Sequence, residues 1–179
     1  MARLTATQAG GTNVLAFLDM LAWSEGTSTL MHSDDGYNVL VGGTLFTDYS
    51  AHPRRLIALP RYGIRSSAAG RYQFLARTWD AIVSLYGFHG RFTPQAQDLA
   101  AVKLLEECAA LTAIRAGRID QAITAAAPIW ASLPGAGYGQ HEHVLSALLG
   151  IYKQERAAEA SDRDDLLAMY TACGGQSAA

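Results

Sequence analysis

The sequence predicts a mostly helical α+β fold in a single domain, and three observations lead to this prediction. A helical apolar spacing starts at Asn13, a glycine-centred hairpin pattern covers residues 36–50, and helical segments fill most of the chain from Tyr72 onward. The chain has 179 residues, of which 50% are hydrophobic and 17% are charged. This length and this balance suit one folded core of a globular protein.

The first predicted element is a helix that follows a flexible N-terminal arm. Residues 1–12 are small and polar and include paired glycines, so we expect a loose arm there. The helix begins at Asn13 and ends at Gly26, a residue typical of a helix C-terminus. Its apolar face has the three- and four-residue spacing of a helix and consists of Val14, Phe17, Leu18 and Leu21.

A β-hairpin is predicted next. In residues 36–50, two runs of β-branched and aromatic residues flank Gly42-Gly43, which is typical of a tight turn between two strands. Residues 51–69 contain prolines, glycine and paired serines, so we expect an extended connection without regular structure.

The second half of the chain is predicted to be helical. Thr93 and Pro94 have the residue types of a helix N-cap and first turn. The expected helices cover 72–86, 93–115, 119–126, 141–158 and an acidic piece at 162–172, with a glycine-rich loop at 132–140. We therefore expect a main domain over 13–152 and a helical extension with a tail over 153–179.

Composition excludes several classes of function. The net charge of -2 argues against nucleic acid as the main partner. The sequence has neither a long apolar segment nor the pattern of a signal peptide, so we expect no stable membrane insertion and a product that stays in the cytoplasm where it is made. Cys108 and Cys173 form no disulfide or metal motif and suit a reducing compartment.

One stretch has an uneven charge. Between Tyr49 and Trp79 there are six arginines and no acidic residue. These arginines either face an anionic polymer or form a solvated surface that pairs with acids from elsewhere in the fold. Both interpretations stay open at the level of sequence.

Glu25 is a carboxylate on the apolar side of the first predicted helix. It lies four residues after Leu21 and seven after Leu18, which extends the apolar stripe. Burial and the negative end of the helix dipole would both raise its pKa, as a general acid near neutral pH requires. The alternative is that the last turn frays and Glu25 reaches water.

Four sequence blocks resemble the phage lambda endolysin family and appear in the order found there. They are FLDMLAWSEGT (17–27), GYNVLVGGTLFTDYSAHPRRL (36–56), AGRYQ (69–73) and IWASLPGAGYGQ (129–140). The resemblance covers about residues 13–152. It implies a lysozyme-like α+β fold, in which a small β region and a set of helices form the two walls of a substrate cleft, and it makes Glu25 of WSEG the catalytic acid.

The resemblance also implies an activity. Members of the family are lytic transglycosylases that cut the bond between N-acetylmuramic acid and N-acetylglucosamine in the glycan strands of peptidoglycan and leave 1,6-anhydro ends. It implies host cell lysis. We expect a monomer without cofactor or metal. Because the sequence lacks the pattern of a signal peptide, we expect it to reach the wall through a membrane pore made by a separate holin. The alternatives are a hydrolytic muramidase and a non-catalytic module that binds peptidoglycan or belongs to a phage tail.

The implied mechanism needs one carboxyl group, whereas a hydrolase of the usual kind needs a second one. Asp34, Asp35 and Asp48 are the acids that we consider for such a role, although loop and strand-end positions also suit structural roles. Asn38 stands where a family member has Asp, which weakens a two-carboxylate mechanism.

The remaining blocks predict the walls of a sugar cleft, because aromatic rings stack on sugar faces and amides bind hydroxyl groups. The alternative for Tyr72 and Tyr138 is a place in the core. His141 and His143 lie two apart on a predicted helix and so face different sides, which makes metal binding improbable. The predicted substrate-binding residues are Ser24, Tyr37, Asn38, Tyr49, Gly70, Tyr72, Gln73, Tyr138 and Gln140.

Overall fold

A central helix, α2 (Thr12–Ser24), is packed on all sides by the rest of the chain in a computed structural model that describes residues 1–172. Every residue from Val14 to Ala22 is buried. A helix that is buried all round is fixed by its neighbours, and the principal one is α7 (Leu145–Ala172), which contributes Leu148 and Tyr152 to the core. The position of the residues at the end of α2 is therefore well determined.

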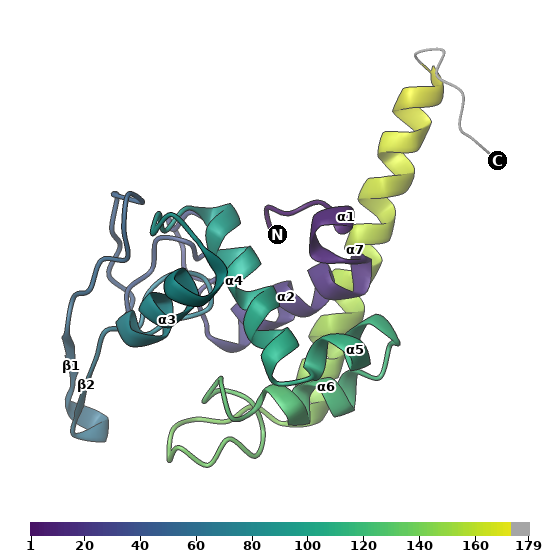
Figure 1. The fold of residues 1–179 in the computed structure, drawn as a ribbon. Coiled ribbons are helices and arrows are strands. Elements are labelled where there is room, and N and C mark those ends of the chain that lie inside the picture. The colour runs from purple at the N-terminus through teal and green to yellow at the C-terminus, as the bar shows by residue number, and fades with distance from the viewer. Residues whose placement is uncertain (173–179) are drawn as a thin grey trace.

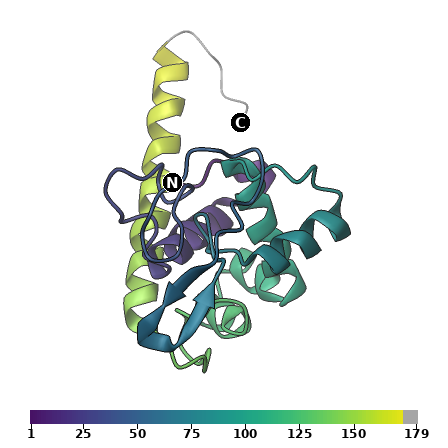
Figure 2. The ribbon, with the colours of Figure 1, turned by 90° about the vertical axis from the view of Figure 1, so that its left-hand side faces the viewer.

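The other helices surround α2, and a small hairpin lies apart from them on the side opposite α7 (Figure 1). Figure 2 turns this hairpin toward the viewer, with helices behind it. The remaining elements are α1 (Ala6–Ala9), β1 (Ile57–Leu59), the 3-10 helix η1 (Pro60–Tyr62), β2 (Ile64–Ser66), α3 (Ala76–Tyr86), α4 (Pro94–Glu107), α5 (Ala110–Arg115) and α6 (Ile119–Ala126). The architecture is α+β, as the sequence predicts.

The N-terminal segment is packed, which differs from the loose arm expected for residues 1–12. Thr5 and Gln8 form a capping box that begins α1. Leu4 and Ala9 are buried in the core, and the Ala2 backbone N–H donates to the Asp19 carboxylate over 2.7 Å. The small and polar residues of this segment form a short capped helix that packs on the core. The prediction of a loose arm, which rested on composition, was therefore wrong.

The two regular strands lie outside the predicted hairpin, so that prediction is corrected. The turn at Gly42-Gly43 does form, closed by backbone N–H donation from Leu40 to Thr44 and from Gly43 to Leu40. Beyond it, Leu40 pairs through an isolated bridge with Ala69, so the 36–50 segment joins a later part of the chain as well as itself. The antiparallel strands β1 and β2 are instead in 51–69, the stretch expected to lack regular structure.

Two helix boundaries in the middle of the chain also differ from the prediction. α3 starts at Ala76 rather than at Tyr72, because Phe74 donates to Ala69 and closes a turn before the helix. The helix predicted over 93–115 is interrupted at Ala109, whose φ of 61° is left-handed and separates α4 from α5. The boundaries of α6 agree with the prediction.

The last helix begins later than predicted and is longer. α7 starts at Leu145, so residues 141–144 belong to the preceding loop, and it joins the two helical pieces predicted over 141–158 and 162–172. The glycine-containing tail with Cys173 lies outside the described residues. Within residues 1–172, no helix combines the length and the apolar character needed to cross a membrane.

Candidate active site

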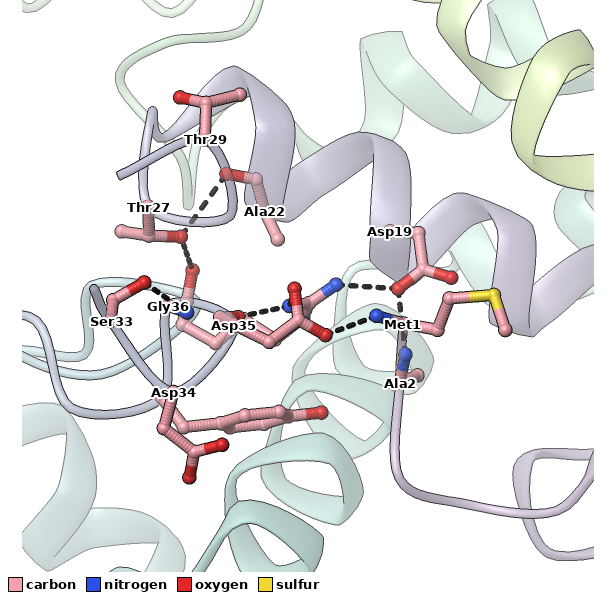
Figure 3. A network of polar contacts seen from close by, with 12 residues as sticks. Met1, Ala2, Asp19, Ala22, Thr27, Thr29, Ser33, Asp34, Asp35 and Gly36 are labelled. Atoms are coloured by element: carbon pink, nitrogen blue, oxygen red, sulfur yellow. Dashed lines mark hydrogen bonds and ion pairs between the residues drawn. The ribbon is translucent and has the colours of Figure 1, made fainter. Parts of the chain in front are cut away.

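Glu25 caps the C-terminus of α2. Its backbone N–H donates to the carbonyl oxygen of Leu21 over 3.0 Å, and Gly26 then turns the chain with a φ of 71°. The next buried residue is Thr27, whose hydroxyl oxygen lies 2.6 Å from the carbonyl oxygen of Arg71 and 3.1 Å from that of Ala22, within hydrogen-bond distance of both. Figure 3 shows Thr27 beside Ala22. These bonds hold the turn after Glu25 and therefore the direction of its side chain.

The Glu25 carboxyl is half-buried and accepts a short hydrogen bond. The Ser132 hydroxyl donates to Glu25 Oε1 over 2.6 Å. Burial raises the pKa of Glu25 from 4.5 to about 7, although the hydrogen bonds from Ser132 act in the opposite direction. Glu25 can thus hold a proton near neutral pH, which is the direction that its spacing on the helix predicts.

Two adjoining cavities meet at Glu25. The first extends along Gly42 and Gly43 toward Tyr62, and the second extends between the β1–β2 hairpin and the segment 128–131. Both are lined by Glu25, Val41, Gln73, Ala131 and Gln140. Together they form a cleft with the carboxyl at its middle, one wall from the β region and the other from the loop between α6 and α7.

Four of the predicted binding residues line this cleft: Ser24, Gln73, Tyr138 and Gln140. The Gln73 amide donates to the carbonyl oxygens of Gly70, at 2.9 Å, and Val39, at 3.3 Å, which fixes its orientation. The Tyr138 hydroxyl donates to Pro128 over 2.6 Å, while its ring is more than half exposed. Amide groups and an exposed ring are suitable partners for a sugar.

Tyr37 and Tyr72 lie in the interior, so their predicted role in binding substrate is corrected. Both side chains are buried, and both hydroxyls donate to Asp98 Oδ1, at 2.8 and 2.6 Å. A buried phenol needs a hydrogen-bond partner, and Asp98 supplies it for two rings at once. For Tyr72, the alternative of a core residue is the one that the structure supports.

Gly70 has a packing role in place of the expected contact with sugar. It is buried with a φ of 79°, and a Cβ at this position would lie 2.2 Å from Gln97 Oε1. Asn38 and Tyr49 are also directed elsewhere. Asn38 accepts from the backbone of Asp34, and the Tyr49 hydroxyl donates to the Asp34 carboxylate. Neither side chain lines the two cavities.

The acids considered as a second carboxylate are bound outside the cleft. Asp34 accepts from Tyr49 and from Arg3. Asp35 binds Arg71 and the amino group of Met1 (Figure 3), and Asp48 accepts from the backbone of Ser50. Among the described residues that line the two cavities, Glu107 is the one carboxylate in addition to Glu25.

Glu107 was missed in the sequence because nothing there connects the end of α4 with Glu25. It is exposed, lines the second cavity only, and accepts from the Tyr86 hydroxyl at 2.6 Å. The first cavity has Glu25 as its single carboxylate among the described residues.

The arginine-rich stretch divides into two kinds of side chain. Arg71 is buried and pairs with Asp19 at 2.6 Å, and Arg54 pairs with Asp80 at 2.9 Å. The other four are exposed and have no ion pair within the described part of the chain: Arg55, Arg61, Arg65 and Arg77. Pairing with acids therefore accounts for part of the stretch only.

The loop at 132–143 contains the contacts that sequence reasoning did not find. Ser132 reaches Glu25, and the His143 ring nitrogen Nε2 lies 3.1 Å from the carbonyl oxygen of Ser24. His141 and His143 precede α7 instead of lying on it, which corrects their predicted placement on a helix. Residues 1–172 show no group of three potential metal ligands around them.

Comparisons with known proteins agree on one family. A family model described as Endolysin matches residues 15–160. The chain is 51% identical over 142 residues to the endolysin of Escherichia phage lambda, which covers 78% of this chain and 88% of that relative. It is 45% identical over 151 residues to the endolysin of Escherichia phage P2, which covers 79% of this chain and 91% of that relative.

Solved structures with the same fold come from the same group of phage proteins. A structure of bacteriophage lambda lysozyme in complex with a chitohexasaccharide superposes with a TM-score of 0.76 at 46% identity, covering 87% of this chain and 97% of that one. Another structure of lysozyme from bacteriophage lambda gives a TM-score of 0.72 at 45% identity, with the same coverage. The fold is therefore lysozyme-like, as predicted.

Proposed function

The chain belongs to the endolysin family, and from this membership we propose that it cleaves the glycan strands of peptidoglycan with Glu25 as its acid. The observation that carries the proposal is the Glu25 carboxyl, half-buried at the middle of a cleft, with a pKa of about 7. A chitohexasaccharide, the ligand in the lambda lysozyme complex, is a chain of β-1,4-linked N-acetylglucosamine units, and a glycan of this kind suits the amides and the exposed ring of the cleft.

We further propose that the reaction is a transglycosylation. Protonated Glu25 donates its proton to the glycosidic oxygen while the bond from C1 to that oxygen breaks, and the acetamido group of the substrate stabilises the cation at C1. The Glu25 carboxylate then accepts the proton of the C6 hydroxyl, whose oxygen bonds to C1 and closes a 1,6-anhydro ring. The proton returns to Glu25 and no water is consumed.

The distribution of carboxylates supports this mechanism. An inverting hydrolase places its two carboxyl groups roughly 6.5–9.5 Å apart, and a retaining one about 5–5.5 Å apart, on the two sides of the sugar. Asp34, Asp35 and Asp48 have other partners, and Glu107 is held by Tyr86 in the second cavity. A mechanism that uses Glu25 alone requires none of them.

Product analysis distinguishes transglycosylation from hydrolysis. Peptidoglycan is digested in water enriched in ¹⁸O, and the fragments are examined by mass spectrometry. We expect 1,6-anhydromuramic ends without the heavy isotope. Reducing ends that contain ¹⁸O would identify a hydrolytic muramidase and reject the transglycosylase.

A lysis assay tests whether the protein is an enzyme at all. The turbidity of Gram-negative cells with a permeabilised outer membrane is followed after addition of the parent protein, Glu25→Gln or Glu107→Gln. We expect clearing by the parent and by Glu107→Gln, and a near-complete loss with Glu25→Gln at an unchanged circular dichroism spectrum. If the parent binds walls without clearing them, the protein is a non-catalytic binding module.

The cellular setting stays a prediction of the sequence. It comprises accumulation in the host cytoplasm, passage through a holin pore to the wall, and action as a monomer.

A further inference from the structure

The Glu25 carboxyl has a hydrogen-bonded partner that comes from a distant part of the chain. Ser132 lies in the loop between α6 and α7, 107 residues after Glu25, and its hydroxyl is 2.6 Å from Glu25 Oε1. On its other side, Ser132 Oγ lies 3.0 Å from Ser24 Oγ. Ser24 Oγ lies 2.8 Å from the carbonyl oxygen of Leu21. The four groups form one continuous chain that runs from the carboxyl to the backbone of α2.

We propose that Ser132, supported by Ser24, is a positioning residue that hydrogen-bonds the Glu25 carboxyl in both of its protonation states. The inference deepens the proposed function and rests on it, because the acid acts first as a proton donor and then as a proton acceptor.

The donors and acceptors of these four hydrogen-bonded groups can be matched in both protonation states of Glu25. A serine hydroxyl donates one hydrogen and accepts through its lone pairs. When Glu25 is ionised, Ser132 donates to its Oε1, and the Ser24 hydrogen goes to Ser132 or to Leu21. When Glu25 is protonated in the free enzyme, it donates to Ser132, Ser132 donates to Ser24, and Ser24 donates to Leu21. With substrate bound, the carboxyl proton goes to the glycosidic oxygen and Ser132 donates to Oε1 again. Every hydrogen has an acceptor in both states, and only hydroxyl rotations separate them.

The loop that carries Ser132 is fastened to the end of α2. The backbone N–H of His143 donates to the carbonyl oxygen of Ser132 at 2.9 Å. The His143 ring nitrogen Nε2 binds the carbonyl oxygen of Ser24 at 3.1 Å, and the ring packs on Trp23 with centroids 4.8 Å apart. The distance between Ser132 and Glu25 is therefore set by packed groups on both sides.

Several titratable groups lie near Glu25, but the main polar contact of its carboxyl is the hydrogen bond with Ser132. Titratable groups near the carboxyl are His141 and His143 on the loop, Tyr62 on the hairpin side of the first cavity, and Arg77 and Glu107 in the second cavity. Among the described residues, Glu25 has no ion pair with any of them. Burial raises its pKa and the bonds from Ser132 lower it.

The test compares Ser132→Ala, Ser132→Cys and Ser24→Ala with the parent and with a matched control, Ser84→Ala, which removes an exposed hydroxyl from α3. The carboxyl carbon of residue 25 is titrated by ¹³C NMR, assigned by its absence from Glu25→Gln. The pH dependence of the initial lysis rate is measured in parallel. The NMR readout needs no activity, so it separates this inference from the proposed function.

The expected result is an upward change in the midpoint of the titration. The bond from Ser132 to the ionised carboxylate is charge-assisted and therefore stronger than the bond to the protonated carboxyl. Its loss favours the protonated form, so Ser132→Ala should raise the midpoint by about one pH unit. The descending limb of the pH–rate profile should move by the same amount, while the maximum rate falls on the order of tenfold through loss of positioning. Cysteine is a weaker donor, so the midpoint of Ser132→Cys should lie between those of Ser132→Ala and the parent. Ser24→Ala should raise the midpoint by less than Ser132→Ala does. The midpoint of Ser84→Ala should match that of the parent.

Two results would overturn the inference. One is a Ser132→Ala protein that titrates like the parent, whatever its rate. The other is a loss of rate with an unchanged pH profile, which would make Ser132 a packing contact. Should Ser132→Ala not fold, Ser132→Cys and Ser24→Ala decide the question by the same readouts. A parent that clears no walls but whose midpoint moves with Ser132 would contradict the proposed function and support the hydrogen-bond chain.

Discussion

Replacing Glu25 with Gln should stabilise the protein at alkaline pH, because the fold keeps a carboxyl where its charge is unfavourable. Burial raises the pKa of Glu25 from 4.5 to about 7. A group with a raised pKa in the folded state stabilises the fold fully below its unfolded pKa and loses this contribution as the pH rises through the folded one. At about 1.4 kcal/mol for each pKa unit, the loss above pH 7 is at most about 3.5 kcal/mol, and water in the cleft reduces it.

Urea denaturation of the parent and of Glu25→Gln, followed by circular dichroism from about pH 4 to pH 8, measures this contribution. Gln retains an oxygen that can accept from Ser132, so the substitution removes the charge with little change of shape. We expect equal unfolding free energies near pH 4 and a more stable variant by about 1 to 3 kcal/mol near pH 8. The same change at the exposed Glu107 serves as the control. A difference between parent and Glu25→Gln that stays constant with pH would refute the reasoning.

Three further substitutions test the corrected roles of residues behind the cleft. Gly70→Ala should lower the unfolding free energy in urea by about 2 to 4 kcal/mol, because its φ is left-handed and the new Cβ would meet Gln97; an unchanged midpoint would contradict this packing. Arg71→Met should cost about 3 to 5 kcal/mol in the same assay by leaving the Asp19 carboxylate buried without its partner, and equal stability would argue against that ion pair. Tyr72→Phe should lose about 1 to 3 kcal/mol of unfolding free energy, because it removes a buried hydrogen bond. Its affinity for an N-acetylglucosamine oligomer, measured by calorimetry, should not change. Weaker binding at full stability would show that Tyr72 contacts the sugar after all.

The parts of the fold that the sequence predicts well are those set by local patterns. The apolar residues of α2 and the stop at Gly26 define that helix to within two residues at each end, and α6 agrees fully. The turn at Gly42-Gly43 also forms. The strands were placed wrongly because pairing depends on distant partners, as Leu40 meets Ala69. In addition, no residue of β1 or β2 is buried, so the strands have no apolar face that marks them in the sequence.

The candidate site shows the same division between local and distant information. The motif around Glu25 indicates the proposed acid, and Gln73 and Gln140 follow from the resemblance. The placement of the tyrosines could not be predicted, because an aromatic ring with a hydroxyl suits both a sugar and a buried carboxylate. The deciding partner is Asp98, which lies 61 residues after Tyr37 and 26 residues after Tyr72 in the sequence.

The chemical character of Glu25 arises from two segments, of which the WSEG motif is only one. A glutamate at a helix end ordinarily reaches water and keeps an ordinary pKa. Here the carboxyl is half-buried beside residues of the loop at 132–143, and Ser132 from that loop partly offsets the effect of burial. Because the compensating hydrogen bond comes from this loop, relatives with an identical WSEG motif and a different residue at position 132 should differ in the pH at which their activity declines. The motif thus contains the proposed acid, and Ser132 of the loop adjusts the pH range in which that acid holds its proton.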